Sequence, residues 1–460
     1  MFDVVVTGGT VVTSGGAFQQ DIGITDGTIQ SLAAPGLLDG REEVDADGLL
    51  VFPGFVDSHV HARLSIGDFT TVDEFHDLTR AAAFGGSTTI MPFAIPRPNE
   101  TPQQAVRRRL SHAAENAYVD YGFHGCITDV DDNLTDIIVN LADLGIGSIK
   151  VFMIYGERLR VDDGELRSVM QSVADEGGVL LVHAENDAII NRSVERRVDR
   201  GDTHYSVHPE THPPVSETSA MWTVLELVAE TDCPTVIVHA STTETRRIVE
   251  TAEERGLPLI VETCPHYLCI SETRYHDENG ERYVCSPPLR SADHQSALWE
   301  MVAGGAISFV NSDHCGFTID QKRRYRDDVT RIPNGLPGIE TCKTLLFSEG
   351  VAKGPLSLQR FVDLAATNPA RTFGLYPQKG TISVGADADL VTFDPDHEWK
   401  LTDDSLHMAS DYTPFDGMDV TGMPRTVLVR GTPVIRNGSL VGSLTQGSHI
   451  STSNSQVLLG

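Results

Sequence analysis

Apolar residues recur through the middle of the chain in eight short runs, with longer segments of helical spacing between them. The first run ends near residue 60, and the others lie at 87–94, 121–128, 148–155, 177–185, 234–241, 257–264 and 306–313. Segments 165–176 and 243–255 are typical of the intervening helices. Eight strands alternating with helices predict an α/β fold, a (β/α)8 TIM barrel over residues 51–375, although doubly wound sheets show similar alternation.

The two ends of the chain have a different pattern, with short strands separated by turns. Residues 1–50 contain the turn signals Asp26-Gly27 and Asp47-Gly48, and residues 376–440 alternate in the same way. Each end is small for a domain, so we expect the two to combine into one small β-sandwich. Residues 441–460 are rich in Ser, Thr and Gly, which predicts a flexible tail or an arm onto a neighbouring molecule.

The composition narrows the possible partners. The 460 residues carry a net charge of −30, and 40% of them are hydrophobic, enough for an ordinary core. A surface this acidic repels nucleic acid and anionic membranes, so we expect neither as a partner. The charge favours solubility and indicates little about the chemistry.

The cysteines and the first residues of the chain indicate in which cellular compartment the protein is expected. The seven cysteines are odd in number and include no C-x-x-C pair, which argues against a disulfide framework and for a reducing environment. The start, MFDVVVTGGT, lacks a basic region and a long apolar segment, so we expect no secretion signal. No apolar run is long enough to span a membrane, which requires about 18 residues. We therefore expect a cytoplasmic protein.

Two histidines, His59 and His61, lie one residue apart at the end of the first apolar run. In a strand, alternate side chains share a face, so Asp57, His59 and His61 point the same way. Two interpretations stay open. The three groups form hydrogen bonds at a strand edge, or the histidines form a His-x-His metal clip.

Four more polar residues lie in or at the end of apolar runs. They are Lys150, His183, His239 and Asp313. The carboxyl ends of barrel strands meet at one mouth, where such barrels hold their active sites, so the six residues would converge there. Each alone is open to a structural interpretation, but four His and one Asp together are ligands suited to hydrolytic divalent metals. We expect His124 and His314 to be structural and His266 to support the site from behind.

The sequence at this point resembles the cyclic amidohydrolases of the dihydropyrimidinase and hydantoinase family. The matching stretches run in family order from about residue 50 to 392. They include PGFVDSHVH, SIKVFMIY, VHAEN, VHAST, CPHYL, SPPLR, SDHCGF, IPNGLPGIE and NPARTFGLYPQKGTISVGADADLV.

The resemblance implies a site with two divalent metal ions, expected to be zinc, in the barrel. His59 and His61 would hold one ion, His183 and His239 the other, and Lys150, carboxylated by CO2, would bridge both. Asp313 would bind the first ion and act as the base. The resemblance also implies that Tyr155 donates to the substrate oxygen and that Ser286 and Asn334 hold the ring amide.

The implied activity is the opening of a cyclic ureide, a dihydropyrimidine or a 5-substituted hydantoin, to an N-carbamoyl amino acid. We also expect a homo-oligomer, a tetramer or a dimer. Arg63 and the histidine of CPHYL resemble dihydroorotases and allantoinases instead, so activity on those ureides is the alternative. Arg63 would then bind a substrate carboxylate, or otherwise form a salt bridge. A non-catalytic assembly role is disfavoured because all six ligand positions are filled.

Overall fold

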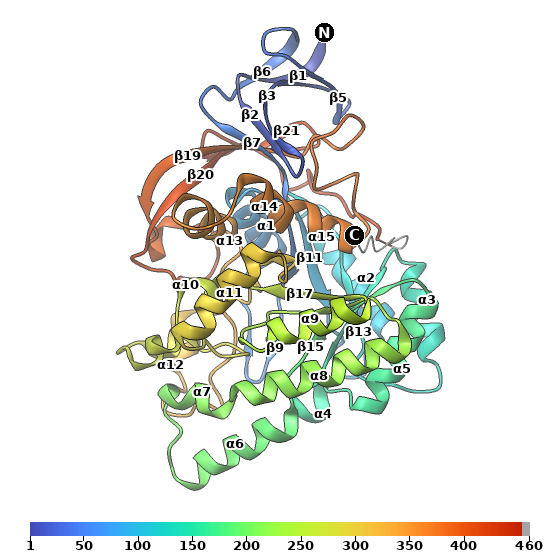
Figure 1. Cartoon of the computed structure of the whole chain (residues 1–460), viewed down its shortest axis with the longest axis vertical. Coiled ribbons are helices and arrows are strands. Elements are labelled where there is room, and N and C mark those ends of the chain that lie inside the picture. Colours follow the sequence, from blue (N-terminus) through green and yellow to red (C-terminus); the bar gives the residue numbers. More distant parts are fainter. Residues whose placement is uncertain (453–460) are drawn as a thin grey trace.

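The centre of the computed structural model, which describes residues 1–452, is a sheet of parallel strands curled into a barrel (Figure 1). The strands are β8 (Phe55–Val60), β11 (Ser87–Ala94), β13 (His124–Cys126), β14 (Ser148–Phe152), β15 (Val179–His183), β16 (Thr235–Ile237), β17 (Leu259–Thr263) and β18 (Phe309–Val310). A short strand, β12 (Asp120–Tyr121), pairs with β11. Neighbouring strands follow chain order without the reversal of a doubly wound sheet.

The barrel closes beyond β18. Val60 pairs in parallel with His314, and the His61 amide donates to the His314 carbonyl at 2.7 Å. The predicted (β/α)8 barrel is thus confirmed, and all eight apolar runs contain barrel strands. Every residue of β11, β14 and β15 is buried, because helices cover the outer face and the barrel interior covers the inner face.

Helices cover the outside of the barrel (Figure 1). The longer ones are α1 (Phe75–Phe84), α2 (Pro102–Ala113), α3 (Leu134–Ala142), α5 (Asp163–Asp175), α8 (Pro214–Thr231), α9 (Thr245–Arg255) and α11 (Ala292–Gly304). The helices expected at 165–176 and 243–255 are α5 and α9. Helix α5 begins where Asp162 accepts from the amides of Gly164 and Glu165, and α9 ends at Gly256, which has a φ of +64°.

Shorter elements occupy the loops and the far end of the barrel. They include α4 (Gly156–Leu159), α7 (His208–Thr211), α10 (Pro265–Cys269), α12 (Ile319–Arg323), α13 (Cys342–Leu345), α14 (Leu358–Val362) and α15 (Asn368–Thr372). The hairpin β9 (Ser65–Ile66) and β10 (Phe69–Thr70) follows β8. Helix α6 (Asp187–Asp199) extends away from the barrel on the side opposite the chain-end sheets (Figure 1).

Both ends of the chain contribute to two further sheets. One has the order β5-β4-β1-β6 and the other β22-β21-β20-β19-β7-β2-β3. The strands are β1 (Phe2–Thr7), β2 (Thr10–Thr13), β3 (Gly16–Gln19), β4 (Asp21–Thr25), β5 (Thr28–Ala33), β6 (Gly40–Asp45), β7 (Leu50–Pro53), β19 (Leu390–Lys400), β20 (Asp419–Val429), β21 (Thr432–Arg436) and β22 (Ser439–Leu440). One apolar cluster joins them, with Val6 and Ile22 from the first end and Leu390 and Leu428 from the second. The two ends therefore share a core, as the alternating patterns predict.

The segment expected to be a flexible tail is partly ordered. Ser448 and Tyr121 are joined by a backbone hydrogen bond of 3.0 Å, and the Thr452 amide donates to Gly145 at 2.9 Å. Residues 441–452 thus lie against the barrel beside β12, contrary to the expectation for this part. Residues 453–460 lie outside the described part of the chain.

Lysine is scarce, and most of its copies are buried. The chain has six lysines, of which Lys150, Lys322, Lys343 and Lys379 are at most 2% exposed. A buried ammonium group requires partners or a lowered pKa, because burial disfavours its charge. Each of these four positions therefore requires a local chemical explanation.

Candidate active site

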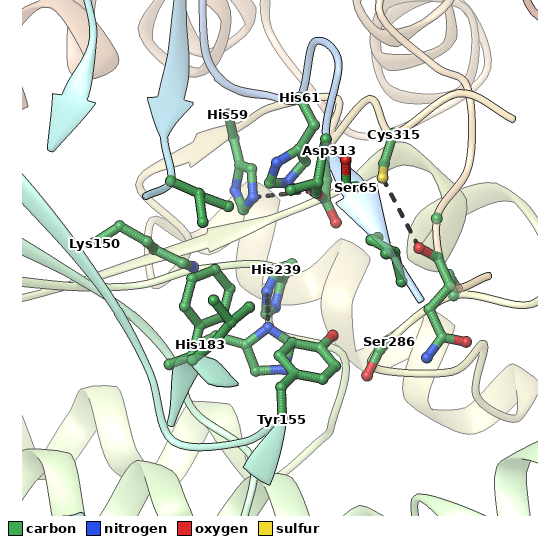
Figure 2. A pocket seen from close by; sticks show the side chains of 18 of the residues that line it. His59, His61, Ser65, Lys150, Tyr155, His183, His239, Ser286, Asp313 and Cys315 are labelled. Carbon is green, nitrogen blue, oxygen red and sulfur yellow. Dashed lines mark hydrogen bonds and ion pairs between the residues drawn. The ribbon is translucent and has the colours of Figure 1, made fainter. Parts of the chain in front are cut away.

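A cavity of about 300 Å³ opens at the carboxyl ends of the barrel strands. Nine of the ten residues predicted for the site line it: His59, His61, Lys150, Tyr155, His183, His239, Ser286, Asp313 and Asn334. Figure 2 shows the side chains of six of them, which come from different barrel strands or their ends, pointing toward one another: His59, His61, Lys150, His183, His239 and Asp313. The structure thus brings together residues as far as 275 positions apart in the sequence, His59 and Asn334.

His59, His61 and Asp313 form the tightest group. Asp313 Oδ1 lies 3.0 Å from His59 Nε2 and 3.2 Å from His61 Nε2. Burial opposes ionisation of Asp313, but the histidine beside it outweighs this and holds the carboxyl pKa well below its usual range. Burial lowers the pKa of His61 to about 4. The ligand atoms of the three residues all lie within 4.8 Å of one another, so they could hold a metal ion.

His183 and His239 form a second group beside the first (Figure 2). His239 Nε2 lies 3.0 Å from His183 Nδ1, and burial lowers the pKa of both rings, which favours their neutral form. Neutral imidazole nitrogens are the form that binds metals. The pair could therefore provide ligand nitrogens once the direct contact between the rings is exchanged for an ion.

Lys150 extends from β14 toward both groups. Its Nζ is buried with no hydrogen-bond partner in the described chain, 5.3 Å from the ring centre of Phe93 and 4.9 Å from that of Phe152. Burial lowers the pKa of the amine to about 8. A buried amine without a partner is costly, so this position is suited to chemistry that the unmodified side chain does not satisfy.

Two carboxylates that the sequence reasoning missed support the histidines. Glu262, on β17, lies 2.6 Å from His59 Nδ1, and Glu185 lies 2.7 Å from His183 Nε2. Burial alone would lower the pKa of His59, but Glu262 and Asp313 raise it to about 9. Such partners fix the orientation of a histidine ring and raise its basicity toward a metal. The signal for Glu262 was present, since it lies inside an apolar run as Lys150 does.

Three residues on loops complete the cavity wall. The Ser286 hydroxyl donates to Glu185 Oε2 at 2.8 Å, and Asn334 Oδ1 is buried without a partner among the described residues. The Tyr155 ring lies 5.4 Å from that of His183. Asn334 Oδ1 therefore remains available to accept a hydrogen bond from a ligand in the cavity.

The backbone is strained at several of these positions. Tyr155, His239 and Asp313 have φ values of 78°, 43° and 46°, in the left-handed region that non-glycine residues avoid. Such conformations persist where the surrounding structure enforces them, and they concentrate at functional sites. The strain is typical of residues whose side chains are positioned for a functional site and not for packing.

Arg63 is the predicted residue that the structure does not place on the cavity wall. Its guanidinium pairs with Glu74, and both side chains are about half exposed, at 49% and 45%. His124 and His314 have structural hydrogen bonds, to Ser148 and Asp73 respectively. Their structural roles match the sequence-based expectation.

His266 lies behind the site. Its Nε2 is buried without a partner among residues 1–452, and its ligand atom lies within 4.8 Å of those of Cys264 and Asp313. It does not line the cavity, so its place fits the supporting position expected for it.

The barrel, the strand-end cavity and the His/Asp group define a class of protein. Residues 50–434 match the model of the amidohydrolase family, and the chain belongs to that family. It is 39% identical to a D-hydantoinase from Geobacillus stearothermophilus over 97% of this chain and 95% of the relative. It is 37% identical to a D-hydantoinase from Streptomyces coelicolor, covering 99% of each chain.

Solved structures of other proteins have the same fold as this chain. The dihydropyrimidinase from Brevibacillus agri NCHU1002 superposes with a TM-score of 0.95 at 37% identity, covering 97% of this chain and 98% of the other. The resemblance to dihydropyrimidinases and hydantoinases is therefore confirmed over nearly the full length. No helix in the described chain combines the length and apolar character needed to cross a membrane.

Proposed function

We propose that the protein is a metal-dependent hydrolase that opens the cyclic amide bond of a dihydropyrimidine or a 5-substituted hydantoin. The product is an N-carbamoyl amino acid. One observation carries the proposal: six metal-ligand candidates converge on one cavity, in a chain whose full-length relatives are named hydantoinases.

The metal centre is proposed to hold two divalent ions, zinc by preference. His59, His61 and Asp313 would hold one ion and His183 and His239 the other. Four imidazoles and a carboxylate suit the borderline character of zinc. When bound, such ions supply Lewis-acid activation of a water molecule and of the substrate carbonyl.

Lys150 is proposed to be carboxylated. Its amine would take up CO2 and release a proton, leaving an anionic carbamate with two oxygens that can bridge two cations. The Nζ without a hydrogen-bond partner between two aromatic rings supports this, because a fixed ammonium there would repel metal ions and would be costly to bury.

The remaining residues act on the substrate. Asp313 accepts the proton of the attacking water and returns it to the leaving ring nitrogen. The Tyr155 hydroxyl donates to the oxygen on which negative charge develops. Ser286 and Asn334 hold the ring amide, largely through their backbone.

The cavity also has an apolar wall suited to a ring substituent. Leu64, Ile66, Ile95, Phe152 and Leu159 line it. Carbon-rich walls bind an uncharged substituent, whereas Arg63, which would bind a carboxylate, pairs with Glu74 instead. The alternative of a dihydroorotase or allantoinase is therefore not favoured.

A substrate panel tests the proposal. Purified protein of measured zinc content is assayed with dihydrouracil, hydantoin, 5-substituted hydantoins, allantoin and dihydroorotate, and kcat/KM is compared. We expect the highest kcat/KM with dihydrouracil or with the hydantoins. Activity confined to allantoin or dihydroorotate, or full activity in protein without metal, would overturn it.

We further propose that the enzyme works in the cytoplasm as a homo-oligomer, a tetramer or a dimer. All seven cysteines are free and six are buried, as suits a reducing compartment. Mass photometry of the purified protein tests the assembly, and a monomer at all concentrations would contradict it.

A further inference from the structure

Lys322 is a buried lysine whose chemistry the proposed mechanism does not use. It lies on α12 and is 0% exposed. Its Nζ donates to the carbonyl oxygens of Val284 and Pro333, both at 2.7 Å. The amine thus joins two chain segments that lie 49 residues apart in sequence.

Both carbonyls directly precede residues that line the cavity. Val284 is followed by Cys285 and Ser286, and Pro333 is followed by Asn334 and Gly335. These are the two segments proposed to hold the ring amide. A change in the distance between the two carbonyls would therefore change the distance between the two sides of the ring-binding site.

The surroundings of Lys322 are unusual for a buried cation. The structure records no ion pair to Lys322 within residues 1–452, and its Nζ lies 5.5 Å from the ring centre of Phe317. The nearby Glu281 pairs with Arg323 and Arg326 instead. Burial lowers the pKa of the Lys322 amine to about 7.

Such a buried group contributes little to stability in itself, since desolvation of the amine opposes the hydrogen bonds that it forms. The effect of Lys322 is on the spacing of the two segments that it joins. Two carbonyl oxygens repel one another unless a donor lies between them. Among the described residues, one direct backbone hydrogen bond joins Val284 to the second segment, from the Gly335 amide to the Val284 carbonyl at 3.1 Å.

We propose that Lys322 is a positioning residue, which sets the spacing of the Val284–Ser286 and Pro333–Gly335 segments and thereby the binding of the substrate ring. This inference rests on the proposed function, because it takes these segments as the ring-binding site. Lys322 acts through the backbone and not on the metal centre, so substrate binding and metal content are separable.

The test compares Lys322→Met with Lys343→Met in the full-length, metal-loaded enzyme. Lys343 is a matched control, because it is equally buried and donates to a backbone carbonyl, that of Val310 at 2.5 Å, but contacts neither ring-binding segment. Methionine keeps the apolar stem of the lysine and removes its donors. The measurements are KM, kcat, zinc content and Tm.

We expect Lys322→Met to raise KM by about tenfold, which corresponds to a loss of about 1.4 kcal/mol of substrate binding. Its kcat should change much less and its zinc content not at all. Lys343→Met should leave KM near that of the wild type, and its Tm measures how far removal of a buried lysine affects stability. Lys322→Arg should give an intermediate KM, because its larger planar group keeps the donors but not the fit.

The outcomes separate the two proposals. A folded Lys322→Met with wild-type KM, or equal KM changes in Lys322→Met and Lys343→Met, overturns the positioning role alone. Should the methionine variant not fold, an unchanged KM in Lys322→Arg overturns the role, and a raised KM supports it. A wild-type enzyme that opens no cyclic ureide overturns the proposed function, and this inference with it.

Discussion

Lys150 and Lys379 are both buried, but they lie at opposite ends of the barrel and in opposite surroundings. Lys379 Nζ contacts carboxylates of Asp120, Asp387 and Asp389 at 2.6, 2.9 and 2.7 Å, where the chain-end sheets meet the barrel. Lys150, at the mouth, has no hydrogen-bond partner in the described chain.

The pKa values follow this difference. Burial opposes the charge of Lys379, but its three carboxylates outweigh burial and raise the pKa of its amine. Burial dominates at Lys150 and lowers its pKa to about 8. The same residue type thus joins two parts of the fold at one end and is left chemically unsatisfied at the other. A buried lysine with all its partners indicates a structural role, and a buried lysine without partners indicates a functional site.

Lys150→Ala should have the largest effect. We expect kcat/KM to fall by more than about 10³-fold, beyond the roughly 10- to 100-fold effect of a group that only supports a ligand. Zinc content should also fall, while far-UV circular dichroism stays unchanged. Lys150→Arg with full activity would contradict the bridging role, since a guanidinium does not form the carbamate.

Lys379→Met tests the structural role that its three carboxylate partners indicate for Lys379. It removes the cation shared by three carboxylates, of which Asp120 keeps an arginine partner, Arg430, so the free energy of unfolding should fall by about 3–5 kcal/mol. In urea titrations the control Lys353→Met should change it by less than about 0.5 kcal/mol, because the Lys353–Glu349 pair is exposed. At temperatures where the protein is folded, kcat should stay at the wild-type value. A loss of kcat with an unchanged free energy of unfolding would show that Lys379 has a functional and not a structural role.

Asp313→Asn keeps the size of the side chain and a ligand oxygen but removes the base. We expect kcat to fall by at least about 10²-fold, the scale of lost general-base catalysis. Zinc analysis of the same preparation distinguishes lost proton transfer from lost metal. Near-normal kcat would show that another group moves the proton.

Arg63→Ala should have the smallest effect. Its guanidinium pairs with Glu74 outside the cavity, so kcat/KM for dihydrouracil and hydantoin should change by less than about fivefold, the scale of an exposed ion pair. Kinetics with dihydroorotate serve as the comparison. A large loss confined to carboxylated substrates that the wild type prefers would promote the alternative function.

Much of the barrel was predictable because its signal is local. A strand buried on both faces needs a continuous apolar run, and a polar residue at the end of such a run is visible in the sequence alone. His183 and His239 were found in this way. Glu262 carries the same signal as Lys150, a charged residue inside an apolar run, but its contact with His59 depends on the fold and leaves no local pattern.

Other features depend on contacts that no local pattern contains. Residues 441–452 are rich in Ser, Thr and Gly, yet they pair with the barrel through backbone groups, which every residue type carries. The partner of Arg63 is Glu74, eleven positions along the chain, and only the fold brings them together. The role of Lys322 likewise depends on two segments that become neighbours on folding.

The burial of lysine also determines how the enzyme can be attached to a support. Among the lysines, amine-reactive reagents reach only the exposed side chains of Lys353 and Lys400. Lys353 and Lys400 both contact Asp419, so they share one small patch, and neither lines the catalytic cavity. Coupling through lysine would therefore hold the molecule beside β19 and β20 and leave the barrel mouth open to substrate.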